Sequence, residues 1–415
     1  MSRQCLIWRG GFAIAIWVLV ASSTSAQDAT MDYPQWRGPN RDGAAAAFVE
    51  PEDWPQQLTR RWAVEVGTGY GTPIIIGSRV YTFTRQDGDE VLSAIDAVTG
   101  RVVWSTRYSA PYRTNAGTER HGPGPKSTPV FYDGKLYTLG IGGVVSAFDT
   151  GDGTRLWQLP DPQVDPLYAT AMSPMVDSGN VIFHVGGHDQ GALTAFGANT
   201  GEVVWRWDGD GPAYASPILA DIDGTRHIVT ITQAHIVGVS AATGELLWQR
   251  PFESNSTNNS ITPIAYGDSI IVSGHRLGVT RFRLVRRGDR WETETVWENK
   301  DVGLFMSNGV LVDDTFFSLS HTNSGQFFAL EVATGETLWS TEGREASNTA
   351  IVKAADLLFL LNDDAELIVM RASRAGFDPF RRYTVADSAT WAQPAISGNR
   401  VFVKDASTLT LWTLD

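Results

Sequence analysis

The sequence contains a single cysteine, Cys5, among its 415 residues. One thiol cannot form an internal disulfide, a cysteine-rich zinc site, an iron–sulfur site or a Cys-x-x-Cys-His haem attachment. Any redox chemistry would therefore depend on a bound cofactor rather than on cysteine.

Basic residues are also scarce. Lys and Arg number 33 against 46 Asp and Glu, which gives a formal net charge of -13 at pH 7. Nucleic acids and anionic membrane surfaces are bound by positively charged patches. The acidic balance therefore excludes the basic footprint that such partners need, and we expect no nucleic-acid partner.

The apolar stretch near the N-terminus, residues 11–21, is too short to span a membrane. It follows Arg3 and Arg9 and precedes small residues that end at Ala26, which is typical of a secretory signal peptide. Nothing after Ala26 resembles a stop-transfer segment, which disfavours a retained anchor. Because Cys5 precedes the apolar stretch, it is misplaced for lipidation at the cleavage site. We expect cleavage after Ala26 and a periplasmic or secreted protein without a membrane span.

Motifs that carry chemistry are missing as well. No Ser/His/Asp triad, glycine-rich phosphate loop or paired-carboxylate pattern occurs, so catalytic residues stay unassigned. Residues 221–224, Asp-Ile-Asp-Gly, resemble part of a calcium loop, but the remaining ligands are absent and Asp-Gly is common in turns. His184 and His188 have helical ligand spacing, yet the Gly-Gly pair between them indicates a hairpin. We predict no metal site in these segments.

Glycine and tryptophan are abundant instead, with 41 and 15 residues. Much glycine with only 19% charged residues favours an all-β fold with many tight turns. One pattern recurs five times: an Asp-type residue, a Gly and a Trp follow one another at intervals of four. The Gly suits a hairpin turn and the Trp opens the next strand. The repeat residues are Asp96, Gly100 and Trp104; Asp149, Gly153 and Trp157; Gly197, Gly201 and Trp205; Ser240, Gly244 and Trp248; Glu331, Gly335 and Trp339.

A second anchor, a polar residue followed by proline, begins each repeat unit. Two weaker units begin near Gly309 and Ala350, which makes eight units of four short strands. The tryptophans from Trp62 to Trp339, with Trp297 among them, are spaced about 46 residues apart, as expected of β-propeller blades. A β-helix would need shorter coils, and a sandwich has no reason to repeat Trp. The anchors are Thr72–Pro73, Thr128–Pro129, Ser173–Pro174, Ser216–Pro217, Thr262–Pro263 and Gln393–Pro394.

The two ends of the repeat region complement each other. The segment around Trp62 reads as an outer strand without preceding partners, whereas residues 391–415 supply three strands and stop before the fourth. Joining them closes the ring and removes exposed sheet edges. We predict an all-β, eight-bladed propeller over residues 59–415, after a signal peptide (1–26) and a leader (27–58).

The repeat A-x-D-x-x-T-G-x-x-x-W resembles the tryptophan docking motif of quinoprotein alcohol dehydrogenases and, more broadly, the pyrroloquinoline quinone (PQQ)-like repeat. Residues 33–43 (YPQWRGPNRDG) resemble the leader of exported bacterial PQQ-like propeller proteins. The same eight-bladed repeat is found in BamB, the outer-membrane assembly lipoprotein. Two departures matter: the vicinal cysteine pair of quinoprotein dehydrogenases is missing, and Cys5 is misplaced for the lipid anchor of BamB.

Topology predicts where a binding site would lie. The long links between blades share one face of the ring with the turns between second and third strands, and long loops on a rigid scaffold commonly carry binding residues. By resemblance, a quinoprotein would hold PQQ with calcium at this funnel mouth. Trp391 as a stacking platform and Lys126 as an anion contact are the strongest candidates, while residues 112–126 form either a lid or a surface crossing. The candidates are Lys126, Tyr168, Tyr214, Asn259, Asn308, Asn348, Trp391, Asp363 and Asp405.

These residues can equally be ordinary rim structure around a water-lined funnel. The leading hypothesis is a monomeric binding or scaffold module that takes a small molecule or protein at the funnel face. One alternative is a PQQ-dependent oxidoreductase of alcohols or sugars, with an acid such as Asp363 or Asp405 as base. A second alternative is a BamB-like outer-membrane assembly partner.

Overall fold

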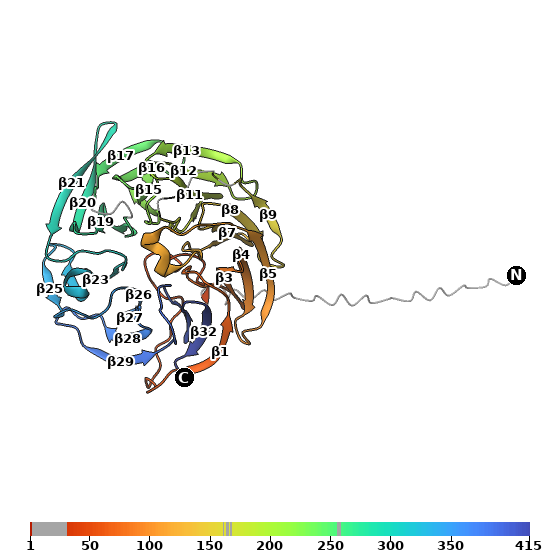
Figure 1. Cartoon of the computed structure of the whole chain (residues 1–415). Helices are drawn as coiled ribbons and strands as arrows, with labels where there is room; N and C mark the ends of the chain where they lie inside the picture. The colour runs from red at the N-terminus through yellow and green to blue at the C-terminus, as the bar shows by residue number, and fades with distance from the viewer. Residues whose placement is uncertain (2–30, 161, 163–165, 167, 255–258) are drawn as a thin grey trace.

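The computed structural model describes residues 1, 31–160, 162, 166, 168–254 and 259–415. The described residues form a ring of eight four-stranded antiparallel sheets around a central axis (Figure 1). This arrangement confirms the predicted eight-bladed propeller. The predicted signal peptide lies outside the described residues except for Met1.

Blades 1 to 4 are formed by consecutive strands, numbered from the ring axis outwards within each sheet. Blade 1 contains β2 (Ile74–Ile76), β3 (Arg79–Gln86), β4 (Asp89–Asp96) and β5 (Val102–Ser109); blade 2 contains β6 (Val130–Tyr132), β7 (Lys135–Leu139), β8 (Val145–Asp149) and β9 (Arg155–Gln158); blade 3 contains β10 (Met175–Asp177), β11 (Asn180–Gly187), β12 (Gln190–Gly197) and β13 (Val203–Gly209); blade 4 contains β14 (Ile218–Ile222), β15 (Thr225–Ile231), β16 (His235–Ser240) and β17 (Leu246–Pro251).

Blades 5 to 7 continue this order, and blade 8 combines both ends of the ring. Two short 3-10 helices, η2 (Ala116–His121) and η3 (Thr322–Ser324), lie in loops. Blade 5 contains β18 (Ile264–Tyr266), β19 (Ser269–Gly274), β20 (Gly278–Arg287) and β21 (Arg290–Asn299); blade 6 contains β22 (Val310–Val312), β23 (Thr315–Ser320), β24 (Gln326–Glu331) and β25 (Thr337–Ser340); blade 7 contains β26 (Thr349–Ala354), β27 (Leu357–Asn362), β28 (Glu366–Arg371) and β29 (Pro379–Thr384); blade 8 contains β30 (Ala395–Ser397), β31 (Arg400–Lys404), β32 (Thr408–Thr413) and β1 (Thr59–Glu65).

The ring closes through its own N-terminal strand. β1 pairs antiparallel with β32, and Trp62 lies opposite Leu411 in the register. Thr59 Oγ1 donates a hydrogen bond to the Asp415 carbonyl at 2.6 Å, which ties the start of β1 to the end of the chain. The predicted closure is therefore confirmed.

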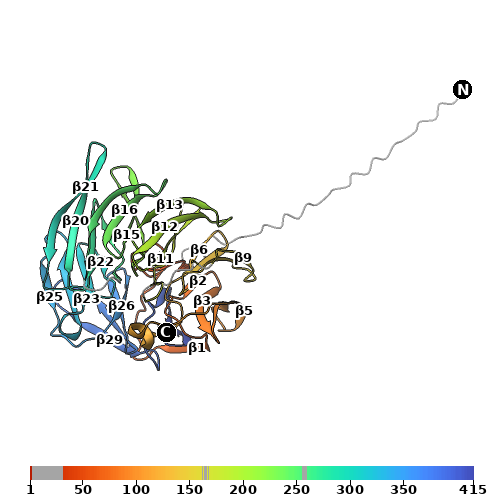
Figure 2. The same ribbon diagram turned by 45° about the horizontal axis from the view of Figure 1, so that its top comes forward.

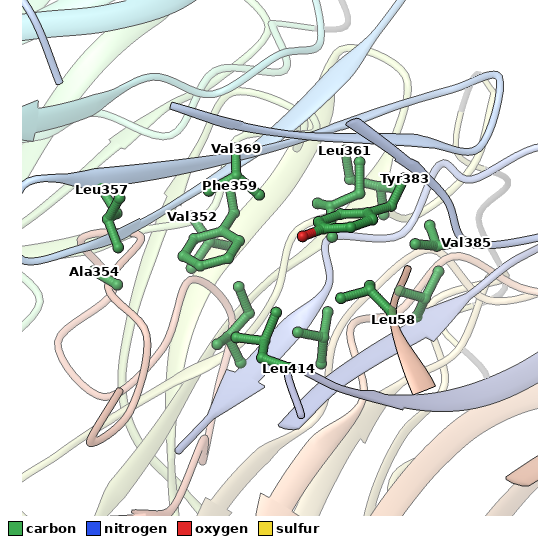
Figure 3. Close-up of a cluster of buried hydrophobic side chains, with 14 residues drawn as sticks. Leu58, Val352, Ala354, Leu357, Phe359, Leu361, Val369, Tyr383, Val385 and Leu414 are labelled. Atoms are coloured by element: carbon green, nitrogen blue, oxygen red, sulfur yellow. The ribbon is translucent and has the colours of Figure 1, made fainter. Parts of the chain in front are cut away.

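The hydrophobic core lies between the blades. Eight clusters of buried side chains each combine residues of two neighbouring blades. Figure 3 shows the cluster between blades 7 and 8, where Phe359 and Tyr383 face Leu58 and Leu414. Stability thus depends on packing each sheet against the next, which explains why the middle strands are apolar on both faces.

The repeated tryptophans join each blade to the next. Trp104 of blade 1 donates a hydrogen bond from Nε1 to the Thr150 carbonyl of blade 2 at 3.2 Å, and its ring covers Gly153. Gly153 has φ +78°, and a Cβ there would lie 2.5 Å from the indole. The same donor bond is made by Trp62, Trp157, Trp205, Trp297 and Trp339 to the following blade.

Two blades depart from this pattern. Blade 5 lacks the docking turn, because β20 and β21, of ten residues each, form a long hairpin that extends beyond the other blades (Figure 2). Trp248 of blade 4 accordingly bonds His227 Nδ1 within its own blade. In blade 7, Arg381 takes the register position of the Trp and donates to the carbonyls of Trp54 and Pro55 in the leader.

Within the described ranges, no helix is long and apolar enough to cross a membrane.

Candidate functional site

The polar residues of three proline anchors, Thr128, Ser173 and Ser216, each accept a hydrogen bond from the backbone of the preceding anchor. The backbone N–H of Thr72 donates to Thr128 Oγ1 at 2.9 Å, Thr128 N–H to Ser173 Oγ at 3.0 Å, and Ser173 N–H to Ser216 Oγ at 2.9 Å. A belt of side-chain acceptors therefore links the starts of the innermost strands of blades 1 to 4. This belt fixes the backbone around the funnel mouth.

A cavity of about 390 Å³ lies at this mouth. It collects six of the nine candidate residues: Lys126, Tyr168, Tyr214, Asn308, Asn348 and Trp391. The other lining residues are Trp36, Tyr70, Gly117, Thr118, Arg120, His121, Ala171, Ser173, Ser216, Ser260, Thr262, Phe305 and Met306. A larger cavity of about 640 Å³ between blades 2 and 3 contains none of the candidates. The funnel cavity, called the funnel pocket below, is therefore the candidate site.

The loop between blades 1 and 2 borders the funnel pocket. Its helix η2 starts where the Asn115 side chain accepts a hydrogen bond from Gly117 N–H, and the Tyr112 hydroxyl bonds the Tyr168 carbonyl of the next long link. In Figure 1 this orange segment lies near the centre of the ring. Since four η2 residues line the cavity, the position of this loop supports the lid and disfavours the surface crossing.

Lys126 anchors this lid. Its Nζ donates to the carbonyls of His121, Gly122 and Gly124 at 3.1, 3.2 and 3.5 Å and lies 4.7 Å from the centroid of the Tyr70 ring. Burial lowers the pKa of Lys126 to about 8. An ammonium has three N–H donors, and these three carbonyls use all of them. Lys126 can therefore attract an anionic ligand through its positive charge, but it has no free N–H to donate to that ligand.

Aromatic rings form one wall of the funnel pocket. The ring centroids of His121 and Trp391 are 4.6 Å apart in an edge-to-face arrangement, and Tyr70 lies 6.4 Å from Trp391. Burial lowers the pKa of His121 to about 4, with the charges of Arg120 and Lys126 acting in the same direction. His121 is therefore neutral near pH 7, and this wall offers stacking surface.

The amide and phenol groups are arranged differently. Asn308 Oδ1 accepts the Thr262 N–H at 2.8 Å, and Asn348 Oδ1 accepts the Ser307 hydroxyl at 3.0 Å, so both amide oxygens are engaged by the scaffold. The buried Tyr214 hydroxyl has no hydrogen-bond partner among the described residues. A buried hydroxyl of this kind is available to a ligand or a bound water.

Three candidates lie outside the lining. Asn259 is 3% exposed and donates from Nδ2 to the Thr232 carbonyl at 2.8 Å. The Asp363 carboxylate accepts the backbone N–H groups of Ser347 and Asn348. The Asp405 carboxylate likewise accepts backbone N–H groups, from residues 407 and 408. These side chains stabilise turns on the funnel face.

The funnel pocket does not fit the calcium ion that the quinoprotein resemblance implies. Calcium binds about six to eight oxygen ligands, and its protein sites use carboxylates. The described lining residues include no Asp or Glu, and the two Asn oxygens already accept hydrogen bonds. Across the described part of the chain, no group of three or more His, Cys, Asp or Glu side chains could hold a metal ion.

Several lining residues escaped sequence reasoning about the site. Trp36 belongs to the leader, and its contribution depends on how that segment passes through the ring. Arg120 and His121 belong to the lid, whose long Gly- and Pro-rich sequence was the only signal. Phe305 packs on His275 at 4.6 Å between ring centroids and lies in the link before β22 of blade 6.

The family model described as "Outer membrane protein assembly factor BamB" matches residues 52–205 and 169–341, which together cover well over half of the chain. The chain belongs to this family. Its sequence is 24% identical over 330 residues to the outer membrane protein assembly factor BamB of Burkholderia pseudomallei (strain K96243), with 67% of this chain and 84% of that protein covered.

The chain is also similar to a subunit of a quinone-type alcohol dehydrogenase. The dehydrogenase subunit of the alcohol dehydrogenase (quinone) of Komagataeibacter europaeus is 23% identical over 368 residues; the match covers 85% of this chain but only 43% of that subunit.

Solved structures show the same fold. BamB from Moraxella catarrhalis has a TM-score of 0.62 at 15% identity and covers 86% of this chain and 97% of its own. The quinohemoprotein alcohol dehydrogenase from Comamonas testosteroni has a TM-score of 0.66 at 14% identity, with 94% and 81% covered. At these identities the likeness establishes the fold alone.

Proposed function

We propose that this chain is an exported, monomeric propeller that acts as a binding module and holds a small aromatic anion in the funnel pocket. The observation that carries the proposal is the composition of the lining. Trp391, Tyr70 and Phe305 supply rings, and the charged side chains of the described lining, Arg120 and Lys126, are both cationic. Ligand sites typically combine apolar and aromatic walls with a few polar groups.

The two cationic side chains, Arg120 and Lys126, contrast in charge with the chain as a whole, which is acidic. A protein with a formal net charge of -13 repels anions at long range, so a local pair of cations beside aromatic rings favours an anion only at this place. An aromatic anion would satisfy both features, because its ring can stack while its charge faces Arg120 and the Lys126 field.

A PQQ-dependent dehydrogenase would need groups that the lining of the funnel pocket does not supply. A dehydrogenase that oxidises an alcohol with PQQ needs a base near the substrate hydroxyl and groups that hold the cofactor. Asp363 and Asp405, the candidate bases, are bonded to backbone N–H groups outside the described lining. The proposal therefore assigns binding rather than alcohol oxidation to this chain.

Calorimetric titration of the mature protein with anilinonaphthalene sulfonate and with PQQ tests the proposal. We expect saturable binding of at least one of these aromatic anions, weakened at least about tenfold by Trp391→Ala. Trp54→Ala is the matched control, because Trp54 packs on Phe359 and Phe380, away from the funnel pocket. No binding of either anion, or equal loss in both variants, would refute the proposal.

A parallel assay separates binding from catalysis. With PQQ and Ca²⁺ added, we expect no reduction of an electron-accepting dye on ethanol or glucose. Sustained turnover would replace the binding module by a PQQ-dependent oxidoreductase.

A protein partner is the second candidate, and the family match favours it. A role as an outer-membrane assembly partner predicts that the chain co-purifies with membrane β-barrel assembly proteins from its native cell envelope. Binding through the funnel face would then be weakened by Arg120→Glu, whereas a small-molecule role predicts no such complex.

A further inference from the structure

Part of the leader, residues 31–46 (the plug segment), crosses the inner ends of the blades. Its backbone forms bridges with the innermost strands at both sides of the ring closure. These contacts join Tyr33 with Ile75 in blade 1, Pro34 with Phe131 in blade 2, Ala44 and Ala45 with Lys353 in blade 7, and Ala46 with Ile396 in blade 8.

Side chains of the plug segment reach the other four blades. Arg41 donates to the carbonyls of Ser173 and Pro174 in blade 3 at 3.0 and 2.8 Å and to the Pro217 carbonyl in blade 4 at 3.0 Å. Arg37 donates to the Gly309 carbonyl in blade 6 at 2.7 Å. Trp36 Nε1 donates to Thr262 Oγ1, before blade 5, at 3.2 Å. The plug segment therefore contacts all eight blades.

Both arginines are buried, with 1% and 7% of Arg37 and Arg41 exposed. A guanidinium carries five N–H donors in a planar fork, which suits the carbonyls that several blades present towards the axis. Desolvation lowers the pKa of Arg41 to about 9 and that of Arg37 to about 10, so both remain charged near pH 7. Burying these charges is costly unless the carbonyls of blades 3, 4 and 6 accept their N–H groups.

The plug segment also separates two cavities. Trp36 lines the funnel pocket, whereas Gln35, Asn40, Arg41 and Asp42 line a second cavity of about 500 Å³. Because the indole N–H of Trp36 is bonded to Thr262, this side chain offers ring carbons rather than a donor to the funnel pocket.

We propose that the plug segment closes the central channel from within and that Trp36 is a ligand-contacting residue of the funnel pocket. Trp36 and the lid then enclose the ligand from two sides. The ligand contact rests on the proposed function, whereas the closure does not.

The ligand contact is tested by titrating anilinonaphthalene sulfonate into Trp36→Ala and Trp36→Phe. We expect the alanine variant to bind at least about tenfold more weakly and the phenylalanine variant to keep most of the affinity, since a ring is retained. Trp54→Ala again serves as the leader tryptophan outside the funnel pocket. If Trp36→Ala binds as the wild type does while Trp391→Ala does not, the proposed function stands and the role of Trp36 is refuted.

The closure is tested without any ligand by thermal unfolding. Arg41→Met keeps the aliphatic stem but removes the bonds to blades 3 and 4, so we expect a fall in Tm of several degrees. Arg382→Met is the matched control, because Arg382 is exposed on β29 and bonds Glu366 at 2.8 Å. Equal Tm values for the two variants would refute the proposed closure by the plug segment. This outcome does not depend on whether the funnel pocket binds a ligand.

Discussion

The ammonium group of Lys126 affects the funnel pocket in two ways. It holds three carbonyls of the lid in place, and its positive charge favours an anion beside the aromatic wall. The second effect depends on protonation, because burial lowers the pKa of this group to about 8. The neighbouring His121, with a pKa of about 4, stays neutral above pH 6 and adds no charge in this range.

The affinity for an aromatic anion should therefore fall as the pH rises through about 8. Below that pH the Lys126 ammonium is charged and attracts the anion, and above it the amine is neutral. Titration of anilinonaphthalene sulfonate between pH 6.5 and 9.5 measures this fall, and Lys126→Met should lower the affinity at pH 7 and remove the step. Lys300→Met, at an exposed lysine, is the control. If the affinity of Lys126→Met still falls as the pH rises through about 8, a group other than Lys126 is responsible for the pH dependence.

At the scale of strands and turns, the same packing of a tryptophan ring on a glycine of the next blade recurs around the ring. A flat indole covers the turn of the next blade, and only hydrogen at the Cα leaves it room. The Asp-Gly-Trp spacing is detectable in the sequence because blades 1, 2, 3 and 6 each carry both the glycine on which the preceding blade docks and the tryptophan that docks on the following blade. Blade 7 could not be read this way, since Arg381 replaces the Trp and bonds the leader, which lies more than 300 residues earlier.

Gly153→Ala should destabilise the protein more than Gly134→Ala does. Both glycines have positive φ, +78° and +73°, so both substitutions carry a backbone cost of about 1–2 kcal/mol. At Gly153 the new methyl would also meet the Trp104 ring at 2.5 Å, which adds about 1–3 kcal/mol, whereas Gly134 has open space around it. Urea unfolding gives both values. Equal destabilisation of the two variants would mean that the Trp104 ring can move away from the new methyl group without a measurable loss of stability.

At the scale of the whole molecule, the fold followed from the sequence and the site followed only in part. The ring was predictable because the anchors and docking motifs recur and the ends are complementary. Six candidates reached the funnel pocket because topology alone brings the residues before the innermost strands to one mouth. Asp363 and Asp405 did not, since carboxylates in turns bond nearby backbone N–H groups first. The path of Trp36 depends on contacts with distant blades, which local patterns do not encode.

Two truncated chains separate the contribution of the closing strand from that of the plug segment. A chain that begins at Leu58 lacks the plug segment but keeps β1, whereas one that begins at Gly67 also lacks β1. Without β1, the edge of β32 is unpaired, and an exposed edge strand recruits other strands. We expect light scattering after size exclusion to show a monomer for the first chain and self-association for the second. A monomeric second chain with the Tm of the first would show that β32 needs no partner and that β1 adds little to ring closure.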